Sequence, residues 1–91
     1  MDIHVQLFSV LRECLPPEAE RGRATIELPE GTTLDGLVSQ LGLAERLRLL
    51  PGQSLKEADW QIMLNGSFEQ DMDRILHDGD QVSVFPPLSG G

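Results

Sequence analysis

The chain has 91 residues, enough for a single hydrophobic core and therefore for one domain. Its 15 acidic and seven basic residues give a formal net charge of −8, which excludes a general affinity for nucleic-acid backbones or anionic membranes and favours a basic protein partner. No apolar run approaches the roughly 20 residues of a membrane-spanning helix, and the first residues lack the pattern of a signal peptide.

Two strands are predicted in the first third of the chain. Residues 3–8 alternate between apolar and polar side chains, and residues 24–28 repeat this pattern after the break at Pro16-Pro17. The two strands should form a hairpin with a long loop. In the first strand, one face takes Ile3, Val5 and Leu7, and the other takes His4, Gln6 and Phe8.

A helix is predicted over residues 32–41. Apolar residues recur there at helical spacing, Thr32 is placed to cap the first turn with Asp35 as the reciprocal acid, and Gly42 is placed to end the helix. A further short helix is indicated by Leu43, Leu47 and Leu50, which precede Pro51-Gly52.

The remaining third predicts three strands. Trp60, Ile62 and Leu64 alternate up to an Asn65-Gly66 pair that is typical of a two-residue hairpin turn, and a short return strand carries Phe68. The last strand places Val82 and Val84 inward. The order of elements predicts an α+β fold with one main helix packed across one face of a mixed sheet.

Strand alternation separates the phenylalanines from this predicted core. If the helix covers the face that carries Val5 and Val82, then Phe8 and Phe85 lie on the opposite face, Met63 has the same parity in its own strand, and Phe68 can join them. Such a patch on a small domain is typical of a protein interface. The alternative is a small second core in which loops cover the rings.

The sequence offers little chemistry of its own. The acids between Glu69 and Asp80 lack calcium-loop spacing, because a loop that starts at Asp71 has Leu76 where glycine is needed. His4 and His77 stand alone, so we expect no bound metal and no bound cofactor. Cys14 cannot form an internal disulfide, which favours a reducing cytoplasm, and its apolar neighbours favour a packing role over a nucleophilic one. We therefore expect a protein that is not itself an enzyme.

The end of the sequence is the candidate working part. Pro86-Pro87 should release the chain from the sheet, because proline has no backbone donor. We expect a domain over residues 1–87 and a flexible tail over residues 88–91. A terminal carboxylate can be activated as an acyl-adenylate, and glycines without Cβ let it pass through a narrow channel.

Four stretches resemble the MoaD/ThiS sulfur-carrier family, which has a ubiquitin-like β-grasp fold. They are LFSVLRE at 7–13, LPEGTTL at 28–34, LNG at 64–66 and DGDQVSVFPPLSGG at 78–91. The resemblance covers nearly the whole chain. The final stretch is most similar to the branch of the family that serves as the small subunit of molybdopterin synthase.

The resemblance implies a cycle centred on Gly91. A ubiquitin-activating-like adenylyltransferase would use ATP to adenylate its carboxylate, and a sulfur donor protein would supply sulfur for a thiocarboxylate. The carrier would then deliver that sulfur to a molybdopterin precursor bound in the large synthase subunit. The resemblance assigns insertion into the partner to Pro86, Pro87, Leu88, Ser89 and Gly90, and docking to Phe8, Phe68 and Phe85, to which strand parity adds Met63.

Three alternatives remain open from the sequence. The chain could carry sulfur for the thiazole of thiamine, or it could be a ubiquitin-like modifier whose Gly91 is joined to lysine on target proteins. It could also be a plain interaction module, which leaves the diglycine ending unexplained. The segment 43–59 is longer than a simple helix-to-strand connection needs, and we interpret it as a loop enlargement rather than a partner-specific contact.

Overall fold

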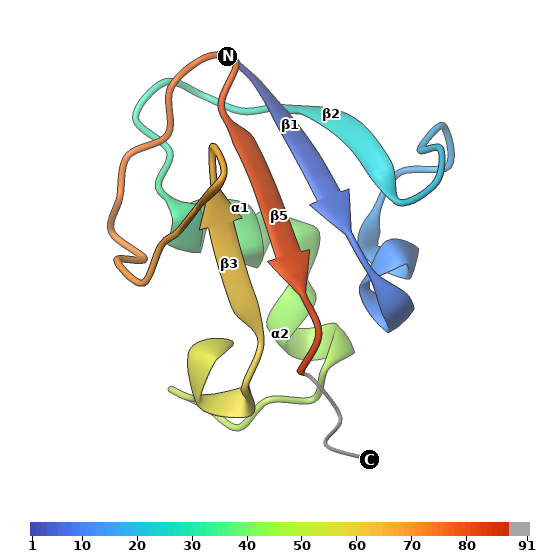
Figure 1. Cartoon of the computed structure of the whole chain (residues 1–91), viewed down its shortest axis with the longest axis vertical. Helices are drawn as coiled ribbons and strands as arrows, with labels where there is room; N and C mark the ends of the chain where they lie inside the picture. Colours follow the sequence, from blue (N-terminus) through green and yellow to red (C-terminus); the bar gives the residue numbers. More distant parts are fainter. Residues whose placement is uncertain (88–91) are drawn as a thin grey trace.

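Five strands form one mixed sheet in the computed structural model, which describes residues 1–87 (Figure 1). The strand order is β2-β1-β5-β3-β4. This confirms the predicted α+β fold. The strands are β1 (Asp2–Leu7), β2 (Arg23–Glu27), β3 (Gln61–Leu64), β4 (Ser67–Phe68) and β5 (Gln81–Phe85), and the helical elements are η1 (Ser9–Cys14), α1 (Leu34–Leu41), α2 (Leu43–Arg46) and η2 (Lys56–Ala58).

The first and last strands run side by side in the same direction. β1 and β5 are parallel, with Val5 opposite Val82 and Leu7 opposite Val84. β1 is also antiparallel to β2, which confirms the predicted hairpin, and β5 is antiparallel to β3. The carboxyl ends of β1 and β5 therefore meet at one end of the sheet, and β3 begins there.

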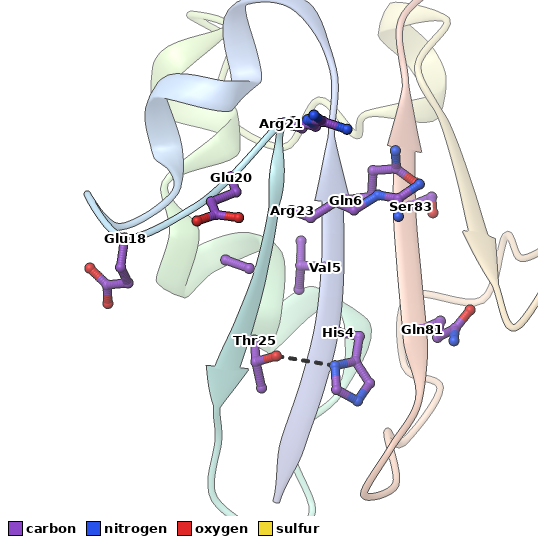
Figure 2. Close-up of a pocket in the computed structure, with 11 residues that line it drawn as sticks. His4, Val5, Gln6, Glu18, Glu20, Arg21, Arg23, Thr25, Gln81 and Ser83 are labelled. Atoms are coloured by element: carbon purple, nitrogen blue, oxygen red, sulfur yellow. Dashed lines mark hydrogen bonds between the residues drawn. The ribbon is translucent and has the colours of Figure 1, made fainter.

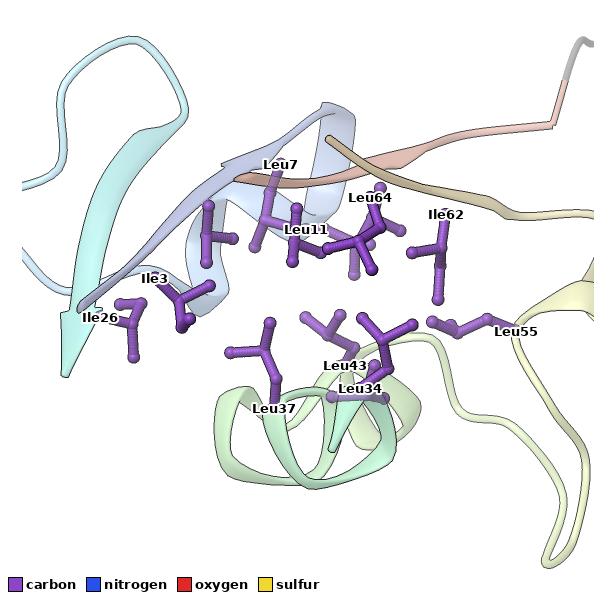
Figure 3. Packing of buried hydrophobic residues seen from close by; sticks show 14 of the residues in the cluster. Ile3, Leu7, Leu11, Ile26, Leu34, Leu37, Leu43, Leu55, Ile62 and Leu64 are labelled. Carbon is purple, nitrogen blue, oxygen red and sulfur yellow. The ribbon is translucent and has the colours of Figure 1, made fainter. Parts of the chain in front are cut away.

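The hydrophobic core lies between one face of the sheet and α1 (Figure 3). Alternate strand residues reach it from the sheet, and helical spacing brings α1 residues to meet them. Trp60 is 8% exposed, which confirms the prediction that it is a core residue. The fully buried side chains are Ile3, Leu7, Leu11, Leu28, Leu34, Leu37, Leu43, Leu76, Val82 and Val84.

The start of α1 differs from the prediction by one residue. Thr33, not Thr32, is the N-cap, and its side chain accepts a hydrogen bond of 3.1 Å from the Gly36 amide. Thr32 instead donates its hydroxyl to the Pro29 carbonyl at 2.7 Å, in the turn before the helix. Asp35 is therefore too near the cap to act as the reciprocal acid, but its charge in the first turn still suits the helix dipole. Gly42 ends α1 in the left-handed conformation, as predicted.

The second predicted helix is shorter than expected. α2 ends at Arg46, and Leu50 is 72% exposed instead of packed. The segment that follows α2 is held by the buried side chain of Leu55. Arg46 also forms an ion pair with Glu13, which joins α2 to η1, an element that the sequence analysis did not predict.

None of the helices in the described part of the chain is long and apolar enough to cross a membrane.

The turn before β2 contains a glycine that the fold requires. Gly22 is buried, has φ +76°, and lies so close to β1 that an added Cβ would be 2.4 Å from the Leu7 carbonyl oxygen. Gly52 has a similar φ of +82°, but an added Cβ would meet nothing within 4 Å. Substitutions at these two glycines can therefore distinguish the cost of left-handed backbone strain from the cost of steric overlap.

We predict that Gly22→Ala lowers the free energy of unfolding more than Gly52→Ala does. Each variant incurs about 1–2 kcal/mol of left-handed backbone strain. Only Gly22→Ala adds an overlap with Leu7, which costs about 1–3 kcal/mol more. Urea unfolding of both variants measures the difference, and equal losses would contradict the close approach of the turn to β1.

Candidate functional site

Two aromatic rings stack on the open face of the sheet, where β1 and β5 end together. The ring centroids of Phe8 and Phe85 are 4.8 Å apart and the ring planes differ by 21°. Phe8 follows the last residue of β1 with extended backbone, so its side chain keeps the alternation of the strand. Both rings are half-buried, and such a pair contributes about 0.5–1.5 kcal/mol beyond its buried area.

Met63 and Phe68 continue this apolar surface across the sheet. Met63 lies opposite Phe68 in β4 and opposite Ser83 in β5, two residues before Phe85 on the same face. Phe68 is 67% exposed. We call the surface formed by Phe8, Phe85, Met63 and Phe68 the apolar band.

The register of the strands confirms the face that parity predicted for these residues. None of the four belongs to the buried core, so the main core is complete without them. The exposure of Phe68 contradicts the alternative of a covered second core for that ring. Their role in binding a partner stays a prediction.

The chain leaves the sheet beside the apolar band. Phe85 is the last residue of β5, Pro86 is half-buried and Pro87 is exposed. Because proline has no backbone N–H, neither residue can donate to the sheet ladder. The other predicted tail residues, Leu88, Ser89, Gly90 and Gly91, lie outside the described residues.

The rest of the open face is polar and hollowed (Figure 2). His4 and Thr25 are joined by a hydrogen bond of 3.1 Å between Nδ1 and Oγ1. Other lining residues come from β1, β2, β5 and the turn before β2: Gln6, Glu18, Glu20, Arg21, Arg23, Gln81 and Ser83. The sequence analysis did not single out this half of the face, although strand parity places Arg23 and Thr25 there.

Other candidate groups are not assembled into a site. Within residues 1–87 no three His, Cys, Asp or Glu side chains are grouped as metal ligands. Cys14 packs against the core, and burial raises the pKa of its thiol, although the nearby Arg46 charge acts in the opposite direction. A raised pKa favours the neutral thiol, as expected for a packing role.

The turn that starts β5 is fixed by side-chain hydrogen bonds. Asp80 accepts one from the His77 amide at 2.8 Å and one from Asn65 Nδ2 at 3.0 Å. Asn65 in turn accepts the Gln81 amide at 2.8 Å, and Asp78 accepts the Asp2 amide at 2.7 Å. Burial alone would raise the pKa of Asp80, but the hydrogen bonds from Asn65 and His77 outweigh it and hold the pKa below its usual value.

Comparisons with known proteins agree with this architecture. Residues 5–91 match the model of the ThiS family. The chain is 34% identical over 97 residues to the molybdopterin synthase sulfur carrier subunit of Drosophila melanogaster, an alignment that covers all of this chain and 92% of the relative.

Solved structures show the same fold. A chain from the protein–protein complex of subunits 1 and 2 of molybdopterin-converting factor from Helicobacter pylori matches with a TM-score of 0.59 and 26% identity, and both chains are covered completely. Small archaeal modifier protein 1 of Haloferax volcanii matches with a TM-score of 0.70 over 96% of this chain and 98% of its own, at 20% identity.

We predict that the ionised Asp80 carboxylate stabilises the fold at neutral pH and that this stabilisation is lost at acidic pH. Its folded pKa lies below the unfolded value of 3.8, so its stabilisation is complete above that pH and is lost as pH falls through the folded pKa. Asp80→Asn should therefore be less stable than the natural chain at neutral pH, and the difference should shrink below pH 3.8. Urea unfolding of both proteins across pH measures this, and a pH-independent difference would contradict it.

Proposed function

The chain belongs to the ThiS family, and we propose that it is a sulfur carrier that works as the small subunit of molybdopterin synthase. The observation that carries this proposal is the position of the Phe8–Phe85 stack at the end of β5. A docking surface lies there immediately before the segment that leads to Gly91. A partner that covers the apolar band is thereby placed to receive the end of the chain.

The chemistry of the proposal takes place on the Gly91 carboxylate. One of its oxygens attacks the α-phosphorus of ATP on an adenylyltransferase, and pyrophosphate leaves. A sulfur donor protein then supplies sulfur at the oxidation level of sulfide, which attacks the activated carbonyl. The bond between the carbonyl carbon and the AMP oxygen breaks, AMP and a proton leave, and a thiocarboxylate remains. Gly90 and Gly91 have no Cβ, which suits passage through a narrow channel of the activating enzyme.

The proposed acceptor of this sulfur is a precursor of molybdopterin. That precursor is bound in the site of the large subunit of molybdopterin synthase. Support comes from the name of the Drosophila relative and from the Helicobacter pylori complex of two subunits. In this proposal the chain is a covalent carrier, and catalysis belongs to its partners. It binds no cofactor of its own, ATP is used by the activating enzyme, and the cycle takes place in the cytoplasm.

Protein modification is the second candidate. The modifier protein of Haloferax volcanii shares the fold, although its 20% identity supports the architecture alone. A sulfur carrier for thiamine thiazole would use the same terminal chemistry. The three candidates differ in the acceptor of the activated Gly91, which is a metabolite in two of them and a lysine of a target protein in the third.

We predict that Gly91 carries the sulfur. Incubation with the adenylyltransferase, ATP and a sulfur donor should raise the intact mass by about 16 Da, the difference between one sulfur and one oxygen. Deletion of Gly91 should abolish this gain and leave the melting temperature within about 1 °C, because the sheet and core are built from residues 1–87. Lysine-linked adducts instead of a mass gain would favour the modifier, and a large loss of stability would contradict the separation of tail and domain.

We predict that Phe68→Asp weakens binding to the large subunit by at least tenfold with little effect on stability, because the ring is 67% exposed. Phe85→Asp should weaken binding at least as much and also lower stability by about 1 kcal/mol through loss of the stack. Leu50→Asp is the matched control, since Leu50 is 72% exposed and lies outside the sheet. Titration calorimetry and thermal unfolding separate the effects, and equal affinities for the Phe68 and Leu50 variants would exclude the apolar band as the docking surface.

A further inference from the structure

A row of side chains crosses the open face and links the apolar band to a cationic edge. Gln6 in β1 lies opposite Arg23 in β2 and opposite Ser83 in β5. Ser83 lies opposite Met63, which lies opposite Phe68. Because directly opposed residues share a face, the row begins with a guanidinium at the β2 edge and ends with an exposed ring at the β4 edge. Figure 2 shows Arg23, Gln6 and Ser83 on this face.

The guanidinium groups at the β2 edge have no ionic partner within the described chain. Arg21 and Arg23 are exposed, and the two ion pairs among residues 1–87 are Arg46–Glu13 and Arg74–Glu69. Glu18 and Glu20 line the same hollow but are not paired with either arginine. Five of the seven basic residues, all of them within residues 1–87, form no ion pair (7 − 2), so Arg21 and Arg23 are distinguished by their shared position beside the open face and not by being unpaired.

The backbone holds both arginines in place. Glu20 and Arg23 exchange two backbone hydrogen bonds, of 3.0 and 2.9 Å, which close a tight turn. Arg21 and Gly22 occupy this turn with φ of +54° and +76°. Arg23 is fixed from both sides, since it also belongs to β2. The positions from which the two charges project are therefore ordered before any partner binds, which lowers the cost of binding.

We propose that Arg21 and Arg23 form a cationic rim of the docking surface and bind a carboxylate of the partner that covers the apolar band. This inference rests on the proposed function, which makes that partner the large subunit of molybdopterin synthase. A guanidinium presents a planar fork of donors that matches a carboxylate, so Arg23 suits bidentate recognition of an Asp or Glu side chain.

The rim adds specificity that the apolar band lacks. A stack of two rings fixes where a partner sits but allows rotation about the contact, whereas an ion pair at the β2 edge sets one orientation. The chain as a whole is strongly acidic, so its general attraction is to basic proteins. A partner must therefore combine a surface that is attracted to a chain of net charge −8 with an acidic side chain opposite Arg23. A uniformly basic protein is repelled by the arginines at the β2 edge.

The test compares three variants in binding to the purified large subunit. Arg23→Glu should raise the Kd by about tenfold or more and slow association at low salt, because it places a carboxylate opposite the carboxylate of the partner. Arg23→Lys should lose less, since it keeps the charge but not the fork. Arg48→Glu makes the same change in charge outside the sheet and should stay within about twofold of the natural chain, as exposed charges do when they have no partner.

Surface plasmon resonance at two salt concentrations measures these rates, and circular dichroism checks folding. If Arg23→Glu disturbs β2, Arg21→Glu in the turn replaces it in the same comparison. A Kd within twofold of the natural value, or a loss equal to that of Arg48→Glu, would overturn the inference. The proposed function would still stand if Phe85→Asp weakened binding in that experiment, and it would fail if neither substitution did.

Discussion

The parallel pairing of β1 with β5 is the constraint on which the rest of the structure depends. It places the first and last strands side by side in the middle of the sheet, and both strands finish at the same end of the sheet. Phe8 and Phe85 are thereby brought into contact although 77 positions separate them in sequence (85 − 8). A parallel pair needs a long crossover, and here the crossover consists of β2, α1, α2 and the strands at the other edge. Every other element therefore serves to return the chain to the side of its first strand.

A sheet that exposes aromatic rings on its uncovered face needs features that limit association between copies of the chain. The helices cover the face that carries the aliphatic residues, and the exposed Phe68 lies on an edge strand of two residues, too short to template pairing with another copy. The opposite edge strand carries charged side chains at Arg23 and Glu27. The net charge of −8 adds repulsion between copies. The acidic composition, one short edge strand and one charged edge strand thus permit the proposed docking surface, which the fold itself does not need.

The sequence predicted the faces of residues better than it predicted their neighbours. Alternation alone placed Phe8, Phe85 and Met63 opposite the core, because the strand period of two leaves no other choice once the buried face is known. It could not predict that Phe8 stacks on Phe85, or that Arg23 aligns with Gln6, since register depends on pairing between distant strands.

The local errors have equally physical causes. Two adjacent threonines have the same capping chemistry, and the position of the hydrogen bond from Gly36 decides between Thr32 and Thr33. Leu50 continued a helical spacing, but the chain turns away after α2 and leaves its side chain exposed. The role of residues 88–91 came from a resemblance and from the chemistry of a carboxylate, and it remains a prediction.

The apolar band also limits where the proposed chemistry can take place. Gln61, the first residue of β3, lies opposite Phe85, the last residue of β5, and Pro86 has no backbone N–H with which to continue the ladder. Gly91 lies six positions after Phe85 (91 − 85), and an extended chain gains at most about 3.3–3.6 Å per residue. The Gly91 carboxylate can therefore reach no more than about 22 Å beyond Phe85. In the proposed cycle, a partner that covers Phe85 while it acts on the Gly91 carboxylate must therefore place its reactive centre within that distance of the ring.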